Sequence, residues 1–369
     1  MKNTLPWMAL KNVKGIGNHL FKKLIERFHT PDEVLRASIQ ELMAVEGISA
    51  ALAKSIKCRK GENKAKRDLD IAFQKGIKII TMADASYPPL LHHIPDPPPV
   101  LYISGILEPA TDNIAVVGSR NATRYGITMA KQLCRDLAHR NLNVVSGMAK
   151  GIDTAAHLGA LAGDGKTFAI LGTGIDVIYP SENKKLFHEI SERGAVISEF
   201  PFGTGPEPYN FPLRNRIICG MSLGTVVVEA GMKSGSLITA RLAAEQGREV
   251  FAVPGSVRSF KSTGTHSLLK QGAKLVEHAN DVIEELLPLL QDRLSEKTEN
   301  QDPPKKNNPT LDSDETIVFK ALEPYPVHID DIMRSTGFNP GKLAGILLKL
   351  ELEGVVNQSP GKFFSTCEE

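Results

Sequence analysis

Short apolar runs alternate with amphipathic stretches through the middle of the chain, between about residues 106 and 288. The runs are rich in β-branched residues, and several end in glycine or in a small polar residue. Stretches with helical periodicity, such as 126–140 and 238–247, lie between them. This alternation predicts an α/β domain with a doubly wound, mostly parallel sheet of the Rossmann type. The predicted strands are 113–118, 143–147, 167–172, 195–200, 225–230, 249–255 and 273–278.

The first 82 residues have helical periodicity throughout and contain one pattern twice. In 13–28 and again in 42–57, an apolar residue precedes a tight turn, and an amphipathic helix follows. Glycine, here Gly15 and Gly47, permits such a turn and leaves backbone N–H groups exposed. The repeat resembles a pair of helix-hairpin-helix units in a SAM-like domain, a common DNA-binding module without sequence specificity. A helical scaffold that merely uses the same turn is the alternative.

The last part of the chain has a different character. Residues 289–310 are polar, rich in proline and asparagine, and balanced in charge, which predicts a flexible linker. Residues 311–369 are predicted to form three short helices and a hairpin, the element order of a winged helix. The chain thus divides into a helical domain (1–82), a Rossmann-type domain (83–288), the linker and a winged-helix-like domain.

Composition is that of an ordinary globular protein. Hydrophobic residues make up 41% and charged residues 23% of the 369, so a sizeable core is expected. Neither a leader peptide nor a membrane span is recognisable, which predicts a cytoplasmic protein without membrane contact. The four cysteines have no metal-type spacing and are expected to be reduced thiols. They are Cys58, Cys134, Cys219 and Cys367.

The net charge of +2 is divided unevenly along the chain. Residues 1–82 contain 16 Lys and Arg against 8 Asp and Glu, whereas residues 311–369 contain 5 against 10. We therefore expect an anionic partner for the first region. A protein partner, instead of DNA, is expected for the last region.

Candidate anion-binding groups follow four of the predicted strands. Small residues, hydroxyls and free N–H groups at helix starts bind anions, and parallel strands bring such ends to one edge of a sheet. Separate cations accompany them, and a row of such groups fits a single strand of nucleic acid with its repeating phosphates. The glycine pattern and acidic residue of a dinucleotide site are lacking, so no cofactor is expected. The candidates are Gly118, Ser119, Arg120, Gly147, Lys150, Gly151, Ser234, Gly235 and Ser236, with Arg214, Asn215 and Arg216.

The segment FPLRNRIICG places two arginines on either side of Asn215 among apolar residues. A guanidinium group matches phosphate geometry with two parallel hydrogen bonds. Arg214 and Arg216 are therefore expected to project into a groove and bind phosphates, with Phe211 and Tyr209 offering faces for base stacking. Structural salt bridges, and core packing for Phe211, are the alternatives.

Five blocks of the middle region, in this order, resemble the DNA-processing protein A family, also called DprA or Smf. They are AVVGSRNATRYG, SGMAKGIDTAAH, LGTGIDVIYPSEN, ISEFPFGTGPEPYNFPLRNRII and SGSLITARLAAEQGREVFAVPG. The resemblance implies a bacterial protein that binds single-stranded DNA during natural transformation, protects incoming strands and loads the RecA recombinase. It also implies a homodimer through the Rossmann-type domain, without an established enzymatic activity.

The same resemblance implies DNA contacts for Arg120, for Lys150 and for the Arg214-Asn215-Arg216 motif. One position departs from the family pattern, because His266 stands where Asn is usual. Any polar contact assigned to that position is therefore in question.

The alternative function is that of a nucleotide phosphoribohydrolase, an enzyme class with a similar Rossmann-type fold. The segment GTVVVEA resembles its motif, with Glu229 as the carboxylate, but the preceding PGG is lacking and one residue is inserted before the Glu. Asp153 and His157 lie one helical turn apart and form a possible catalytic pair; a helix cap and a core residue are the other interpretation. Because no ordered set of nucleophile, base and oxyanion groups is visible, a binding protein is the favoured prediction.

Overall fold

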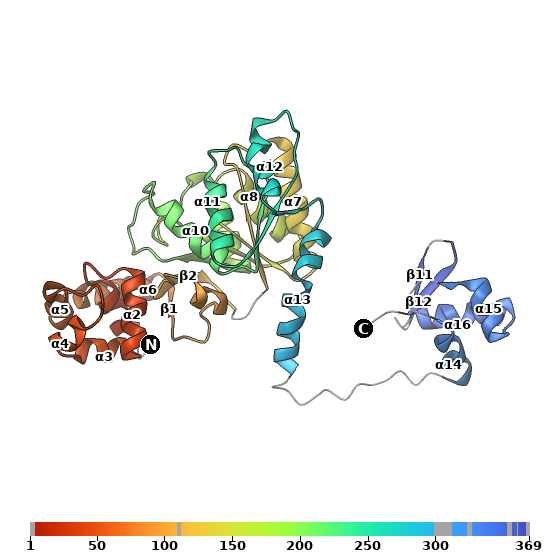
Figure 1. Cartoon of the computed structure of the whole chain (residues 1–369), viewed down its shortest axis with the longest axis horizontal. Coiled ribbons are helices and arrows are strands. Elements are labelled where there is room, and N and C mark those ends of the chain that lie inside the picture. Colours follow the sequence, from red (N-terminus) through yellow and green to blue (C-terminus); the bar gives the residue numbers. More distant parts are fainter. Residues whose placement is uncertain are drawn as a thin grey trace. The chain divides into compact units, whose positions relative to one another are not determined.

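The structure, a computed structural model, describes residues 4–108, 112–298, 312–322, 327–352, 356–359 and 361–366. The chain divides into two compact units, Met1–Ser295 and Glu296–Glu369 (Figure 1). The first unit contains the N-terminal helices and the large sheet, and the second contains the winged helix. Within the described ranges, no helix combines the length and the apolar character that crossing a bilayer requires.

Six helices begin the first unit. The predicted turn residues Gly15 and Gly47 have φ angles of 102° and 95°, in the left-handed region that glycine adopts without steric cost. The two hairpins pack on each other reciprocally, since a Cβ on Gly15 would contact Leu52 and a Cβ on Gly47 would contact Leu20. The predicted pair of helical units is therefore present. The helices are α1 (Thr4–Lys11), α2 (Asn18–Phe28), α3 (Pro31–Arg36), α4 (Ile39–Met43), α5 (Ala50–Lys57) and α6 (Glu62–Gln74).

One strand corrects the expectation that residues 1–82 are helical throughout. β1 (Lys78–Thr81) pairs antiparallel with β2 (Val100–Gly105), which was also not predicted. The β-branched segment KIIT suits a strand, but four residues are too few to show a period of their own. The N-terminal helices thus continue directly into the sheet and belong to the same compact unit.

A nine-stranded sheet forms the centre of the first unit, in the order β1-β2-β6-β5-β4-β3-β7-β8-β9. Neighbours from β6 to β9 are parallel, and β2 pairs antiparallel with β6. All seven predicted strands are present, and the predicted fold class is confirmed. These strands are β3 (Asn113–Val117), β4 (Asn143–Ser146), β5 (Thr167–Ile170), β6 (Ala195–Ser198), β7 (Gly224–Val227), β8 (Glu249–Ala252) and β9 (Lys274–Leu275).

Helices cover both faces of this sheet, as expected for parallel strands that are buried on both sides. Alternate residues of β3 enter different cores: Ile114 and Val116 pack with α7 and α8, and Ala115 and Val117 pack with α10 and α11. The helices are α7 (Arg124–His139), α8 (Ile152–Ala162), α9 (Lys184–Arg193), α10 (Asn210–Gly220), α11 (Gly235–Glu245) and α12 (Thr263–Lys270), with 3-10 turns η1 (Pro89–His93), η2 (Ser181–Asn183) and η3 (Phe260–Ser262).

The first part of the linker predicted at residues 289–310 is helical. Helix α13 (Ala279–Thr298) continues through residues 289–298, with Pro288 inside it. The segment LLQDRLSEKT consists mostly of residues with high helix propensity, so its polarity alone did not indicate a break. Residues 299–310 lie outside the described residues.

The second unit has the predicted elements of a winged helix. Strand β12 lies between β10 and β11 and is antiparallel to both. Val318, Ile332 and Leu347, one from each helix, form part of its core. The elements are α14 (Ser313–Lys320), β10 (Val327–His328), α15 (Ile329–Thr336), α16 (Pro340–Leu352), β11 (Val356–Ser359) and β12 (Phe363–Thr366).

Candidate nucleic-acid interface

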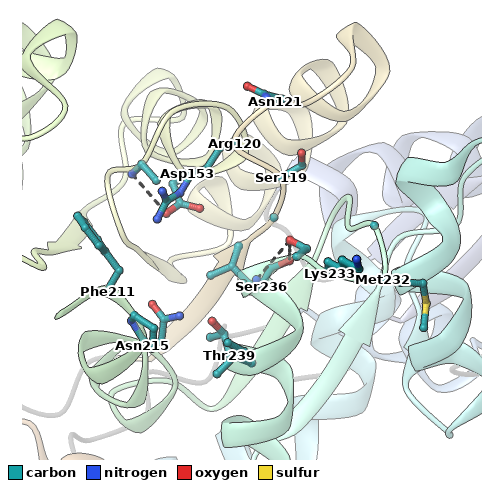
Figure 2. Close-up of a pocket in the computed structure, with 18 of the residues that line it drawn as sticks. Ser119, Arg120, Asn121, Asp153, Phe211, Asn215, Met232, Lys233, Ser236 and Thr239 are labelled. Atoms are coloured by element: carbon teal, nitrogen blue, oxygen red, sulfur yellow. Dashed lines mark hydrogen bonds between the residues drawn. The ribbon is translucent and has the colours of Figure 1, made fainter. Parts of the chain in front are cut away.

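A pocket of about 1000 Å³ opens where the strand order of the sheet reverses, at the carboxyl ends of β3 and β7. The chain passes from β3 through β4 and β5 to β6 in one direction and then returns to place β7 on the other side of β3. Loops that follow two such strands leave in opposite directions, so a crevice forms between them. Figure 2 shows side chains from the loops after β3 and β7 and from α10 and α11 around this pocket.

Arg120 is an exposed cation of the pocket, in the loop that follows β3. Its guanidinium carbon lies 5.2 Å from the centre of the Phe211 ring, which also lies 5.7 Å from the ring of Tyr179. A guanidinium group stacked by its face keeps its N–H edge available for an anion. Of the four arginine and lysine residues singled out from the sequence, Arg120 has the geometry expected of a phosphate contact.

Two of the predicted cradle glycines are required by close packing within the protein. A Cβ on Gly118 would lie 2.7 Å from Ile152, and one on Gly151 would lie 2.3 Å from the carbonyl oxygen of Ser119. The Ser119 amide donates to the carbonyl oxygen of Glu229 at 2.7 Å, and the Ile152 amide donates to that of Ser119 at 3.2 Å. These two amides are therefore engaged inside the protein and are not directed at a ligand.

The start of α11 has the chemistry expected of an anion site. Ser234 caps the helix, accepting a hydrogen bond from the amide of Ser236 at 3.4 Å, and the two hydroxyl oxygens are 2.8 Å apart. Gly235 is exposed, and no described atom lies within 4 Å of where its Cβ would be. Because a helix N-terminus carries a partial positive charge, this part of the pocket favours an anion.

Lys150 is an exposed residue in the loop after β4 and is not among the residues that line the pocket. Its ammonium group forms an ion pair with Glu182, and the two side chains are 59% and 61% exposed. The hydrogen bond to Glu182 and the charge of that carboxylate raise the pKa of Lys150. Exposed pairs contribute little stability, so a phosphate can replace Glu182 at small cost.

Arg214 is buried at the base of the pocket, with 3% of its surface exposed. Its guanidinium group donates to the carbonyl oxygen of Gly147 at 2.7 Å and to that of Ile170, and its Nε donates to the Asn215 side chain at 3.2 Å. A Cβ on Gly147 would lie 2.5 Å from the guanidinium group, so glycine makes room for it. Burial lowers the pKa of Arg214 to about 10, and Asp153 opposes the shift. Arg214 thus joins the ends of β4 and β5.

Arg216 is buried away from the pocket lining. Its guanidinium group forms ion pairs with Glu199 and, at 3.0 Å, with Asp96. Glu199 also accepts a hydrogen bond from the Asn18 side chain at 3.1 Å, and its carbonyl oxygen accepts one from the Lys11 ammonium at 2.6 Å. Arg216 therefore connects α10 to the end of β6 and, through Glu199, to the N-terminal helices.

The sequence predicts that Arg214 and Arg216 project together into a groove, but in the structure both side chains are buried. Both lie on helix α10, where residues two apart point in directions about 200° apart. The apolar residues that follow them, such as Ile217 and Ile218, enter the core and carry both arginines into the interior. The structure therefore has the buried polar contacts that were the alternative interpretation of this motif.

Asp153 and His157, considered as a catalytic pair, have separate partners. Asp153 accepts a hydrogen bond from the Ala149 amide at 3.4 Å, and burial raises its pKa while Arg214 opposes the shift. The Nδ1 atom of His157 lies 2.7 Å from the hydroxyl oxygen of Thr167. Burial lowers the pKa of His157 to about 3, which keeps the imidazole neutral. His157 is therefore the core residue of the alternative interpretation, whereas Asp153 does not cap α8: the cap position is Gly151, and Asp153 lies in the first turn and holds the loop before the helix.

Comparison with known proteins identifies the family. The model of DNA recombination-mediator protein A matches residues 78–287, that of the DprA winged helix domain matches 302–362, and that of the SAM-like helix-hairpin-helix tandem matches 8–57. Protein Smf of Synechocystis sp. is 34% identical over 96% of each chain. The chain belongs to the DprA/Smf family.

Two solved structures of DNA processing protein A resemble this DprA/Smf chain. The protein from Streptococcus pneumoniae is 37% identical, with a TM-score of 0.67 over 75% of this chain and 95% of that chain. The protein from Helicobacter pylori, whose structure describes its single-stranded DNA binding mode, is 30% identical. Its TM-score is 0.51, over 57% of this chain and 96% of that chain.

Two pocket cations of this DprA/Smf protein were missed by the sequence analysis. Lys233 precedes the cap of α11, and Lys261 lies on η3 and donates to the carbonyl oxygen of Asn121, next to Arg120. Extending the helix-start pattern at Ser234 by one residue would have found Lys233. Lys261 has no local signal, because its contact with Asn121 spans 140 residues of sequence.

His266, where the DprA/Smf pattern usually has Asn, lies on α12. Its Nε2 atom is 3.0 Å from the carbonyl oxygen of Gly255. An imidazole N–H and an asparagine amide N–H can both donate to a carbonyl oxygen. His266 therefore supplies a hydrogen-bond donor at this position, as asparagine can.

Proposed function

We propose that this protein binds single-stranded DNA, without marked sequence preference, in the pocket at the carboxyl ends of β3 and β7. The observation that carries the proposal is the set of cations in this pocket, Arg120, Lys233 and Lys261, beside the N-terminus of α11. Such groups bind phosphates and carry little information about base sequence. A volume of about 1000 Å³ is also more than a single phosphate needs.

The aromatic ring of Phe211 supports a single strand over a duplex as the ligand. Phe211 lines the pocket beside Arg120, and the bases of a single strand are free to stack on such a ring. In a duplex the base faces are already stacked on one another. We propose that phosphates bind at Arg120 and at the start of α11 while a base contacts Phe211.

The other predicted residues have graded roles in this proposal. Lys150 contacts the strand beyond the pocket, exchanging Glu182 for a phosphate. Asn215 lines the pocket. Arg214 stabilises the floor of the pocket through its hydrogen bonds to backbone carbonyl groups. Arg216 stabilises the fold through its ion pairs and does not contact the strand. Gly118, Ser119, Gly147 and Gly151 give the backbone its close packing, and Ser234, Gly235 and Ser236 form the anion site.

The family suggests the biological role. We propose that the protein protects incoming single-stranded DNA in the bacterial cytoplasm during natural transformation and loads the RecA recombinase on it, acting as a homodimer. Support comes from the match to DNA recombination-mediator protein A over residues 78–287. A mediator of recombination must hold a single strand and pass it to the recombinase.

Fluorescence anisotropy with a labelled oligodeoxythymidine, mixed-sequence single strands and duplexes tests the binding proposal. Arg120→Ala is expected to weaken binding to all single strands alike and to reduce the magnitude of the log–log salt slope by about 0.7 for one lost contact. Lys185→Ala, which removes a 90% exposed cation outside the pocket lining, is the matched control. Tighter binding to one duplex sequence than to any single strand would contradict the proposal, as would equal affinities of the two variants.

The rival phosphoribohydrolase function has less support. Glu229, the carboxylate such an enzyme would need, accepts hydrogen bonds from the Thr123 amide at 3.1 Å and from its hydroxyl at 2.5 Å. It therefore holds the start of α7. Incubation with nucleoside monophosphates tests this function directly, since release of free base would establish it.

A further inference from the structure

We propose that Phe260 is a second stacking site for bases, so that a bound single strand crosses the sheet edge from Phe211 to Phe260. This role rests on the proposed function and adds to it the course of the strand over the pocket. Phe211 and Phe260 are the aromatic residues among those that line the pocket. Phe260 is the first residue of η3, and 74% of its surface is exposed.

The backbone around Phe260 is fixed by local hydrogen bonds. Its carbonyl oxygen accepts one from the Thr263 hydroxyl at 2.7 Å, and the Ser262 amide donates to the carbonyl oxygen of Ser259 at 3.1 Å. Ser262 is buried, and a Cβ on Gly255 would lie 2.1 Å from its hydroxyl oxygen. The turn is therefore anchored on the protein. A side chain held on a fixed turn loses little conformational entropy when a ligand binds to it.

The ring of Phe260 has no structural role comparable to that of Phe211. Among the described residues, Phe260 belongs to none of the hydrophobic cores, and its ring packs on no other aromatic ring. Phe211, by contrast, contacts Tyr179 and Arg120. The exposed face of Phe260 is therefore available to a base, on which an aromatic ring stacks without regard to sequence.

The two rings lie at different places along the edge of the sheet. A Cβ on Gly172, just after β5, would lie 2.7 Å from the Phe211 ring. A Cβ on Gly231, in the loop after β7, would lie 3.4 Å from the carbonyl oxygen of Phe260. The order β5-β4-β3-β7 puts three strand spacings of about 4.8 Å between these places. The rings are thus roughly 14 Å apart.

Cations occupy the interval between the rings. Arg120 follows β3, and Lys233 lies between β7 and the start of α11. In Figure 2, Phe211 and Lys233 lie on opposite sides of the pocket, with Arg120 between them. Lys261, next to Phe260, donates to a backbone carbonyl oxygen of the Arg120 loop and so ties η3 to it. Rings at both ends with cations between them match a strand whose bases point outward from a row of phosphates.

The separation of the rings sets the length of strand that reaches both. Nucleotides in a stacked strand advance about 3.4 Å each, so roughly 14 Å corresponds to about four steps. An oligonucleotide of about ten nucleotides is therefore long enough to contact both rings at once.

Phe260→Ala in the full-length chain tests the proposal, by fluorescence anisotropy with a labelled oligodeoxythymidine of about ten nucleotides. Loss of one stacked base corresponds to about a five- to hundredfold loss of affinity, which is the expected result. The salt slope should stay that of the wild type, because no charge is removed. Val257→Ala is the matched control, since Val257 is 87% exposed on the same connection after β8 and does not line the pocket.

Two further measurements separate stacking from other contacts. Phe260→Trp keeps a ring and should keep the affinity, whereas Phe260→Leu keeps apolar bulk without a ring and should lose most of it. A strand of the same length with abasic sites in place of its bases offers phosphates alone. Phe260→Ala should bind this abasic strand as well as the wild type does.

Equal affinities of Phe260→Ala and Val257→Ala for oligodeoxythymidine would overturn the second stacking site. An equal loss on the abasic strand would overturn it too, because the ring would then act without bases. Arg120→Ala judges the proposed function separately: if this variant loses single-strand binding while Phe260→Ala keeps it, the pocket stands and only the second ring is wrong. A wild-type protein that binds no single strand would contradict the proposed function and, with it, the role of Phe260.

Discussion

Replacing Arg216 with alanine is expected to destabilise the fold and to leave single-stranded DNA binding nearly unchanged. The side chains of Arg216 and Glu199 are each 8% exposed, and Asp96 lies 3.0 Å from the guanidinium group. The change leaves the Glu199 carboxylate buried without its cationic partner. Breaking a buried ion pair from one side costs about 3–5 kcal/mol. We expect the lower end, about 3 kcal/mol, because the Asn18 side chain still donates to Glu199.

A loss of this size is measurable by differential scanning fluorimetry. In domains of 150–250 residues, 1 kcal/mol corresponds to about 2–4 °C in melting temperature, so a fall of about 6 °C or more is expected. Arg120→Ala removes the same charge from an exposed side chain, and its melting temperature is expected to stay within about 2 °C. In anisotropy with oligodeoxythymidine, at a temperature where all variants are folded, Arg120→Ala should lose affinity and Arg216→Ala should keep it.

Arg216→Lys distinguishes charge from geometry. Lysine keeps a cation for Glu199 but lacks the planar fork that also reaches Asp96, so it should recover part of the melting temperature. The reasoning is refuted if Arg216→Ala melts like the wild type while its affinity falls and its salt slope decreases in magnitude by about 0.7. Arg216 would then contact a phosphate, as the sequence alone suggested.

Three further predictions follow from burial and charge. Deleting residues 311–369 should leave oligonucleotide affinity nearly unchanged at moderate salt, because this region is acidic; a tenfold loss in a folded truncation would show that the charge argument is wrong. Gly147→Ala should lower the melting temperature by several degrees, since its Cβ would meet the Arg214 guanidinium at 2.5 Å, whereas Gly235→Ala has open space and should not; equal melting would contradict this. Burial lowers the pKa of His157 to about 3 from about 6.5 in the unfolded chain. The unfolded chain therefore binds the proton first, and stability falls by about 2 kcal/mol from this group between pH 7 and pH 5. Urea unfolding of His157→Gln should show a correspondingly smaller loss of stability between pH 7 and pH 5. If the variant kept the pH dependence of the wild type, the assignment of this loss to His157 would be contradicted.

Periodicity along the chain was sufficient for most of the fold. The seven β-branched runs became β3 to β9. For β3 to β7, which are buried throughout, a continuous apolar run is required, and that is a local property of the sequence. The turns at Gly15 and Gly47 were also predictable, since a φ angle in the left-handed region strongly favours glycine. β1 and β2 were not predicted; the edge strand β1, KIIT, is too short to show a period of its own and is defined by its pairing with β2.

The site shows the limit of local information more clearly. Arg120 and the start of α11 were predictable, because a strand end followed by a helix start places both at one edge of the sheet. The role of Arg214 and Arg216 was not, since apolar flanks are compatible with a groove and with a core. Only the packing of α10 against the sheet decided that both guanidinium groups are buried and where each finds its partner. Lys261 entered the pocket for the same reason: a contact across 140 residues is made by the tertiary fold and has no pattern in the sequence.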